Sequence, residues 1–326
     1  MYKDSSYYLN MLKNSDNVEE KLFAIKKLVL FKKENIAQEV IPYLDHSEPV
    51  VRYVTAQTLG YFMFDNVGKA LLEALVEPEE WVRLEIVEAI GKVKPKNAIP
   101  ILLKYLETES DNKIKATIIK VLGILNDEKV IPYIAQFLNS SDERVKANTI
   151  EALENFENSR ILELLKPFKT DKNNRVRANT ALLFVKKGKS EGYEILEDML
   201  KDDNEWMVAS AVYSLGEISN EQALSIMEKN NIFENKNWSI RRNVIIALAK
   251  MVKEKIDKAE KLFLNFLNSP DEEDVLFAVE MAGVHGLKKF LPVLTEKLST
   301  LKGGDLREKI DEAIDSMLEV VDENKV

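Results

Sequence analysis

Side chains that bind metal ions or act as nucleophiles are scarce in this chain. The sequence has no cysteine, which excludes disulfides, thiolate metal sites and cysteine nucleophiles. Its two histidines, His46 and His285, are far apart in the sequence, and neither is followed by glutamate. Glycine-rich phosphate-binding motifs and the GxSxG and HExxH motifs of hydrolases are absent as well. We therefore predict no catalytic residue, no metal ion and no cofactor.

Carboxylates are the abundant ionisable groups, with 55 Asp and Glu residues among 326. In a chain so rich in charge, most of them are expected on solvated faces rather than in catalytic pairs. Their distribution is uneven, because the stretch from Pro270 to the end has 14 acidic and 7 basic residues. Binding to phosphate backbones needs accumulated Lys and Arg, so the composition disfavours nucleic acid as a partner.

A recurring set of small polar and apolar side chains is the candidate binding surface. The set is Asn148, Asn179, Leu182, Ser210, Tyr213, Asn243 and Ile246. The four polar members recur every 31 to 33 residues, and each apolar member follows a polar one by three residues. Helical residues three apart lie on one face, so we expect these side chains to project together. Apolar groups in an open groove indicate a covering partner, whereas a rotated helix would bury them between repeats.

These residues belong to a ten-residue pattern that occurs ten times. Its clearest copy, Val82–Gly91 (VRLEIVEAIG), has apolar residues at helical spacing, a basic second residue and a closing glycine. The copies begin at residues 20, 51, 82, 114, 145, 176, 207, 240, 274 and 306. A fixed period of 31 to 34 residues predicts a solenoid.

A second amphipathic segment lies between successive copies, as in Asn97–Leu106 (NAIPILLKYL), so each repeat is expected to be a helix pair. Four prolines fall near the same place in this segment and predict a shared bend. They are Pro42, Pro100, Pro132 and Pro292. We predict an all-α fold, an α-α superhelix of about ten helix pairs forming one domain over residues 1–326. Degenerate repeats at 1–45 and 287–326 would cap its ends.

The pattern resembles the HEAT-repeat superfamily, through the Val/Ile–Arg/Lys pair that opens the second helix, the Leu/Ile–Gly that closes it and the first-helix prolines. Typical HEAT repeats run to ~40–47 residues, and this shorter period is similar to that of bilin lyases and bacterial adaptor proteins. The resemblance implies that the second helix lines a concave groove. It also implies a ladder in which basic residues pair with acidic residues of the preceding turn. The implied ladder is Arg52, Arg83, Lys115, Lys146, Arg177 and Arg241.

The three tryptophans, Trp81, Trp206 and Trp238, each precede or begin a second helix. We expect them to pack over the junction with the previous repeat, the alternative being an exposed edge that contacts a partner. No run approaches the ~20 apolar residues of a membrane span, and the N-terminus is unlike a signal peptide. A cytoplasmic location is therefore expected.

The function that best fits such a chain is a non-enzymatic scaffold, binding a protein or peptide in its concave groove. Three alternatives stay open by resemblance. They are an immunity protein that neutralises a toxin domain, a bilin lyase or isomerase, and a DNA-binding glycosylase built from HEAT-like repeats. A di-iron centre of the deoxyhypusine hydroxylase type is excluded, because it needs several His-Glu motifs.

Overall fold

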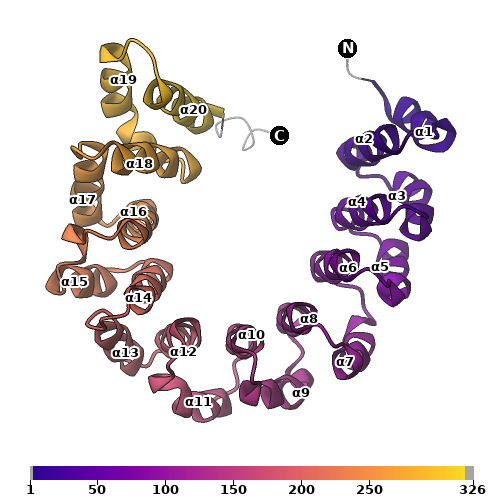
Figure 1. The fold of residues 1–326 in the computed structure, drawn as a ribbon, viewed down its shortest axis with the longest axis horizontal. Helices are drawn as coiled ribbons and strands as arrows, with labels where there is room; N and C mark the ends of the chain where they lie inside the picture. Colours follow the sequence, from indigo (N-terminus) through magenta and orange to yellow (C-terminus); the bar gives the residue numbers. More distant parts are fainter. Residues whose placement is uncertain (1–2, 320–326) are drawn as a thin grey trace. The chain divides into compact units, whose positions relative to one another are not determined.

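The structure is a computed structural model that describes residues 3–319. Twenty α-helices and no strand are found there, so the predicted all-α fold is confirmed (Figure 1). The chain divides into two compact units, residues 1–164 and 165–326, and the boundary falls within α11 (Arg160–Leu165). In each unit the helices alternate between a first row, with odd numbers, and a second row, with even numbers.

Unit 1 contains the first five helix pairs. Its first-row helices are α1 (Ser5–Asn14), α3 (Glu34–Val40), α5 (Asp65–Glu73), α7 (Ala98–Thr108) and α9 (Ile131–Ala135). Its second-row helices are α2 (Val18–Leu28), α4 (Pro49–Leu59), α6 (Glu80–Val93), α8 (Asn112–Leu125) and α10 (Glu143–Leu153). The short 3-10 segments are η1 (Val29–Phe31), η2 (Ile41–Asp45), η3 (Ala74–Val76), η4 (Glu128–Val130) and η5 (Gln136–Asn139). Successive second-row helices pack directly on one another.

Unit 2 repeats this arrangement. After α11, its first-row helices are α13 (Glu191–Met199), α15 (Glu221–Lys229), α17 (Asp257–Leu267) and α19 (Leu291–Thr300). Its second-row helices are α12 (Asn174–Lys186), α14 (Glu205–Ile218), α16 (Trp238–Lys253), α18 (Glu272–Val284) and α20 (Asp305–Glu319). The 3-10 segments are η6 (Lys166–Thr170), η7 (Ile232–Glu234) and η8 (Lys288–Phe290). The predicted succession of about ten helix pairs is therefore present, whereas a single domain over 1–326 with capping ends stays a prediction.

The prolines divide the first-row helices. Pro42, Pro132 and Pro292 each lie at the start of a new helical segment that directly follows another, as where α3 ends at Val40 and η2 begins at Ile41. Pro100 lies in the first turn of α7. Proline lacks an N–H, which it does not need in a first turn, so each new segment begins there at little cost.

Side-chain hydrogen bonds hold the turns at which second-row helices begin, as before α12 and α14. Asp171 accepts the N–H of Asn173 through its carboxylate at 2.8 Å, and Asp202 accepts that of Asn204 at the same distance. Asn173 then caps α12 by accepting the N–H of Val176 at 3.1 Å. Such side-chain bonds satisfy free amides and fix where a helix starts. The turn therefore sets the register of the side chains that follow.

The closing glycines allow second-row helices to approach closely. A Cβ on Gly123 of α8 would lie 2.8 Å from both Cα and O of Ala152 in α10. A Cβ on Gly216 of α14 would lie 2.8 Å from the Cβ of Ala247 in α16. Only glycine fits where two backbones are this close. The glycine of the sequence pattern is therefore a packing residue between repeats.

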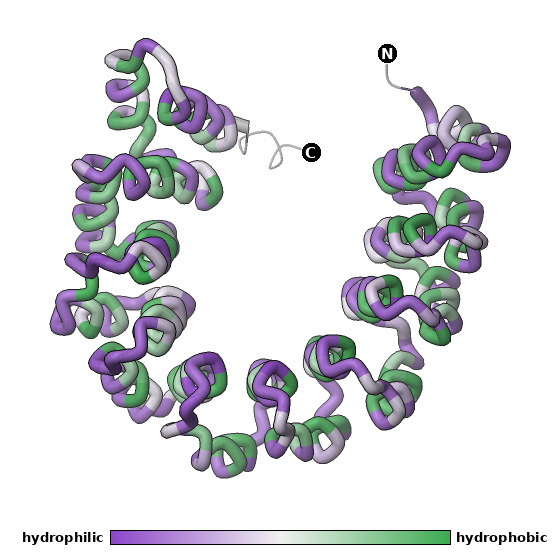
Figure 2. The backbone as a smooth tube through the Cα atoms, in the orientation of Figure 1, coloured by the Kyte–Doolittle hydropathy of each residue, from purple (hydrophilic) through white to green (hydrophobic). Residues whose placement is uncertain are grey.

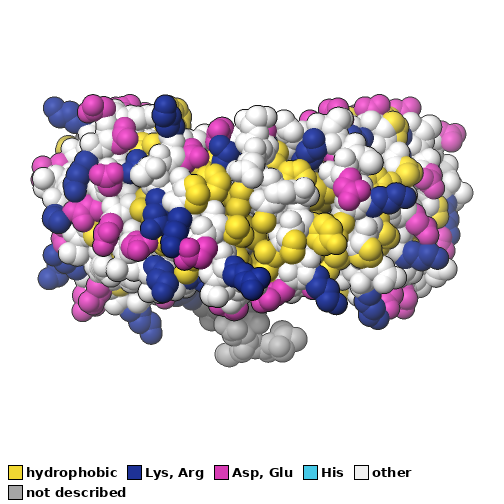
Figure 3. Space-filling model, turned by 90° about the horizontal axis from the view of Figure 1, so that it is seen from below, with side chains coloured by type: hydrophobic (Ala, Val, Ile, Leu, Met, Phe, Trp, Pro, Cys, Tyr) yellow, Lys and Arg dark blue, Asp and Glu magenta, His cyan; other side chains and the backbone are white. Residues whose placement is uncertain are grey.

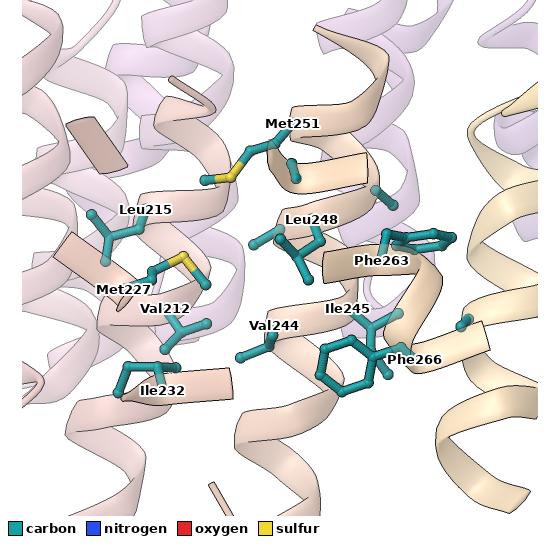
Figure 4. Close-up of a cluster of buried hydrophobic side chains, with 14 of the residues drawn as sticks. Val212, Leu215, Met227, Ile232, Val244, Ile245, Leu248, Met251, Phe263 and Phe266 are labelled. Atoms are coloured by element: carbon teal, nitrogen blue, oxygen red, sulfur yellow. The ribbon is translucent and has the colours of Figure 1, made fainter. Parts of the chain in front are cut away.

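The apolar core runs between the rows and between neighbouring pairs of each unit. Figure 2 shows that each helix alternates along its length between hydrophilic and hydrophobic residues, as amphipathic helices do. In unit 2, Val244 and Leu248 of α16 point toward Val212 and Leu215 of α14 (Figure 4). Ile245 points the other way, toward two phenylalanines of α17. Burial of each such side chain stabilises the fold by about 1.5–3 kcal/mol.

Candidate interaction surface

The basic second residue of each repeat connects consecutive turns. Arg52 donates through Nε and Nη2 to the two carboxylate oxygens of Glu77, both at 2.7 Å. Its Nη1 donates to the carbonyl oxygen of His46 at 2.8 Å. Arg83 repeats this geometry one repeat later, with the carboxylate of Glu109 at 2.8 and 3.2 Å and the carbonyl of Glu77 at 2.7 Å. Bidentate pairs of this kind are the strong, geometrically specific ones.

The carboxylate partner of each of these arginines lies in the following turn and not, as the resemblance implied, in the preceding turn. The expected partner was an acidic side chain of the preceding turn, but the preceding turn supplies main-chain carbonyls and the following turn supplies the carboxylate. Arg241 likewise pairs with Asp271 at 2.7 Å and Asp274 at 2.8 Å, 30 and 33 residues later. A guanidinium has five donors in a fixed fork, so one arginine reaches both turns.

The remaining ladder positions are less regular. Arg177 donates to the carbonyl of Lys169 and the carboxylate of Asp198. Lys146 pairs with Glu143 of its own helix at 3.0 Å, and Lys115 has no ion pair among residues 3–319. Lysine offers a single charged nitrogen and cannot copy the arginine fork.

Two further basic residues, in the first and last copies of the pattern, also donate to main-chain carbonyls of the preceding turn. Lys21 donates to the carbonyl of Leu12 at 3.1 Å, and Arg307 donates to that of Leu301 at 2.7 Å. Sequence analysis omitted both from the ladder. Each nevertheless occupies the second position of a weak copy of the pattern, which would have revealed them.

The ladder carboxylates have shifted pKa values. Burial pushes the pKa of Glu77 upward, but the hydrogen bonds from Arg52 and from the N–H of Glu79 outweigh it, and the pKa lies below its ordinary value. Glu85 of α6 shows the opposite result. Burial raises its pKa, contacts with Tyr53 and Lys92 only partly oppose this, and its Oε1 has no hydrogen-bond partner in the described residues. Glu85 is therefore a buried carboxylate with incomplete compensation.

The asparagines of the candidate binding set make contacts between repeats. Asn148 of α10 is buried and donates through Nδ2 to the carbonyl oxygen of Ala116 in α8, at 3.3 Å. Asn243 of α16 donates in the same way to Ala209 of α14, at 2.9 Å. These bonds link neighbouring second-row helices. Asn148 and Asn243 therefore hold adjacent second-row helices together, a structural role that the sequence pattern does not predict.

The other polar members of the set are half-buried. Ser210 of α14 accepts a hydrogen bond from Nδ2 of Asn174 in α12, at 2.6 Å. Asn179 lies on α12 and is also half-buried. The expected polar row thus exists on the helices, but it is held largely by neighbouring repeats.

The apolar members of the set have different environments. Leu182 is 9% exposed and packs in the interior, and Ile246 is half-buried against the core of unit 2. Leu182 is therefore not accessible in an open groove, whereas part of Ile246 is. Tyr213 of α14 is 49% exposed, with Nζ of Lys250 lying 5.4 Å from its ring centroid. Binding of a partner by this set stays a prediction.

The tryptophans do not share one environment. Trp81 packs on Tyr53 of the previous repeat, with ring centroids 5.3 Å apart, as expected. Trp238 instead packs edge-to-face on Phe277 of the next repeat, at 5.9 Å. Trp206 is 70% exposed at the first turn of α14. A large exposed aromatic is costly to leave in water, so Trp206 marks a candidate contact that sequence analysis had treated as the minor alternative.

A pocket of about 390 Å³ opens beside Trp238, between α16, α18 and α20. Its apolar walls are Trp238, Leu276 and Phe277. Carboxylates from α18 and α20, together with Lys309 of α20, complete its lining. The pocket could not be predicted from the sequence, although the excess of acidic residues after Pro270 indicates this part of the chain.

A hydrophobic surface also occurs on the first row of unit 1. Figure 3 shows hydrophobic side chains gathered over α7 and α9, on the face seen from below. Tyr133 of α9 is 51% exposed and lines a pocket of about 300 Å³ with Leu103 and Phe137. This face is built from the bent first-row helices and not from the ladder.

Part of the chain matches a known repeat family. Residues 68–154 match the family model of HEAT repeats. Residues 68–154 therefore contain HEAT repeats. This match covers α6 to α10, the region with the bidentate Arg83 pair and the hydrogen bond of Asn148. No curated protein matches the sequence.

Solved structures with similar folds come from several classes. The CpcE–CpcF complex of phycocyanin lyase from Nostoc is 18% identical, with 86% of this chain and 94% of that chain covered and a TM-score of 0.48. Kap95p, solved with RanGDP, is 13% identical, with 97% and 55% covered and a TM-score of 0.48. Human deoxyhypusine hydroxylase is 14% identical, with 76% and 96% covered and a TM-score of 0.35.

Three further observations concern the described residues, 3–319. No group of three or more His, Asp or Glu side chains in residues 3–319 is arranged to hold a metal ion. None of the helices in this range is long and apolar enough to cross a membrane. Burial lowers the pKa of His285, and the nearby charges of Lys250 and Lys253 lower it further.

Proposed function

We propose that this chain is a non-enzymatic scaffold that binds a protein or peptide partner on the second-row helices of unit 2. The observation that carries the proposal is the pair of exposed aromatics on α14, Trp206 and Tyr213. They are seven residues apart, so they lie on one face of the helix, two turns from each other. Trp and Tyr are the residues that most often dominate binding energy at protein interfaces.

The surroundings of these aromatics support a protein partner. Ile246 of α16 adds a half-buried apolar surface, and Lys250 pairs with Glu217 beside the Tyr213 ring. Apolar anchors with a polar rim are typical of protein interfaces. The faces of stacked repeats offer such surfaces over long distances.

Affinity capture followed by titration tests the proposal. Proteins retained by the immobilised chain are identified, and each purified candidate is titrated against wild type, Trp206→Ala and Tyr213→Ala. We expect each variant to weaken binding by ~2 kcal/mol or more, the size of an aromatic hot spot. Tyr133→Ala is the matched control, because Tyr133 is equally exposed (51%) but lies on the first row. Equal binding by all four proteins would disprove the proposed surface.

A further inference from the structure

We propose that the pocket beside Trp238 binds an arginine-bearing basic segment of the partner protein. The inference rests on the proposed function. It states which kind of partner segment binds to α16, α18 and α20, which follow α14 in the same row of helices. Trp238 stands one repeat after Trp206, at the first turn of α16 where Trp206 is at the first turn of α14.

The walls of the pocket suit a planar side chain with an apolar stem. The rings of Trp238 and Phe277 lie 5.9 Å apart and nearly perpendicular, at 78°, and Leu276 extends the apolar surface. The volume of about 390 Å³ is within the range of roughly 300–1,000 Å³ of ligand pockets. An arginine stem would cover the apolar walls, leaving its guanidinium at the rim.

The lining of the pocket has five carboxylates and one lysine, Lys309. Glu273 and Glu280 contribute from α18, and Asp305, Glu308 and Glu312 contribute from α20. Of these five carboxylates, Glu312 alone has an ion pair within residues 3–319, and its partner is Lys309 at 3.2 Å. Like charges grouped around a low-dielectric wall attract a cationic partner and exclude an anionic one. Charge complementarity therefore selects a basic occupant for this apolar pocket.

The aromatic pair favours arginine over lysine. The guanidinium carbon of Arg241 lies 5.4 Å from the Trp238 ring, and that of Arg242 lies 4.9 Å from the Phe277 ring. The chain itself thus stacks guanidinium groups on these rings. Arginine also presents a fork that bonds carboxylates in bidentate fashion, which the compact lysine ammonium cannot do.

The length of the acidic rim favours a peptide segment over a small cation. From Glu273 to Glu280, and from Asp305 to Glu312, the carboxylates extend over seven residues of helix. At 1.5 Å per residue this is roughly 10 Å. An extended chain covers that length with about three residues. Two arginines in alternate positions would therefore meet carboxylates from both helices.

Calorimetric titration of the full chain with capped peptides tests the inference. The probe is a heptapeptide with two arginines in alternate positions, and its counterparts carry lysine or the neutral isostere citrulline. We expect micromolar binding of the arginine peptide, severalfold weaker binding of the lysine peptide and none of the citrulline peptide. No binding of the arginine peptide, or equal affinity of the arginine and lysine peptides, would overturn the assignment. So would spermidine binding as tightly as the arginine peptide.

Paired variants locate the site. Glu280→Gln combined with Glu308→Gln should weaken the arginine peptide at least tenfold. Glu88→Gln with Glu107→Gln, which removes the same charge from exposed positions of unit 1, should change it less than twofold. Equal effects of the two double variants, with both folded by circular dichroism, would overturn the site.

The aromatic variants separate this inference from the proposed function. Trp206→Ala and Tyr213→Ala should leave the affinity for the arginine peptide unchanged, because neither residue lines the pocket. If they abolish capture of the partner while the double glutamate variant does not weaken it, the scaffold stands and the basic-segment assignment is wrong. If the arginine peptide binds at the pocket but no partner depends on Trp206 or Tyr213, the assignment stands and the proposed surface is wrong.

Discussion

Replacement of Arg52 by methionine should destabilise unit 1 locally and strongly. The Arg52 and Glu77 side chains are 12% and 3% exposed, so the substitution leaves a buried carboxylate with only the N–H of Glu79 as a bonding partner. Breaking a buried pair by removing one partner costs ~3–5 kcal/mol. Methionine keeps most of the apolar stem, so the loss should lie near the lower end, about 3 kcal/mol.

The double variant Arg52→Met/Glu77→Gln separates charge from packing. Because it leaves no buried unpaired charge, we expect it to be more stable than Arg52→Met alone. Lys69→Met is the control. Its pair with Glu73 lies within α5 and both side chains are exposed (78% and 69%), so its loss should cost less than about 1 kcal/mol.

Amide hydrogen exchange is the appropriate assay, because long repeat arrays can unfold in parts and give no single free energy. Protection of the α4 and α6 amides should fall in Arg52→Met and recover partly in the double variant. The pKa of Glu77 lies below its ordinary value, so the pair stabilises the fold at a pH above the unfolded-state pKa, and this contribution is lost as the pH falls through the folded-state pKa. The difference between Arg52→Met and wild type should therefore shrink in acid. Equal effects of Arg52→Met and Lys69→Met would refute the reasoning.

Three further predictions concern other positions. Glu85→Gln should raise the free energy of unfolding at pH 7 by about 1 kcal/mol, measured as a higher melting temperature, because the ionised form of this buried carboxylate destabilises the fold. Burial raises the pKa of Glu85, so the difference between variant and wild type should shrink as the pH falls through that pKa. Gly123→Ala should cost about 1–3 kcal/mol in denaturant unfolding through collision with the Ala152 backbone, whereas Gly303→Ala, in open space, should cost little. Tyr213→Ala should cost less than the ~3–5 kcal/mol of a buried aromatic in the same assay; a loss of that size would exclude an exposed contact.

The fold was predictable because one pattern recurs. Apolar spacing such as that of Val82, Ile86 and Ile90 identifies the helix and its buried face, and all three are buried. The closing glycine could be recognised as recurrent, but its reason lies in another repeat, since the Cβ that Gly123 lacks would meet Ala152. Period and amphipathicity are properties of local sequence, whereas close approach depends on how two repeats stack.

The candidate site was harder to predict for the same reason. Asn148 and Asn243 share a repeat position, and their helical spacing predicts that they project into the groove. Each carboxamide instead donates a hydrogen bond to a carbonyl of the previous repeat. Leu182 and Tyr213 share another position, yet one is buried and the other half exposed. Such outcomes depend on how each helix is rotated against its neighbours, and the apolar spacing of one helix does not determine that rotation.

The ladder shows which contacts a repeating sequence leaves undetermined. Glu77 lies six residues before Arg83 and 25 residues after Arg52, and sequence proximity favours the nearer partner. The structure pairs it with Arg52 and gives only its backbone carbonyl to Arg83. One turn therefore serves two arginines through different groups, so each turn is fixed to the repeats on both sides. Loss of one arginine should weaken two junctions, which is why the Arg52 variant is expected to expose amides in both α4 and α6.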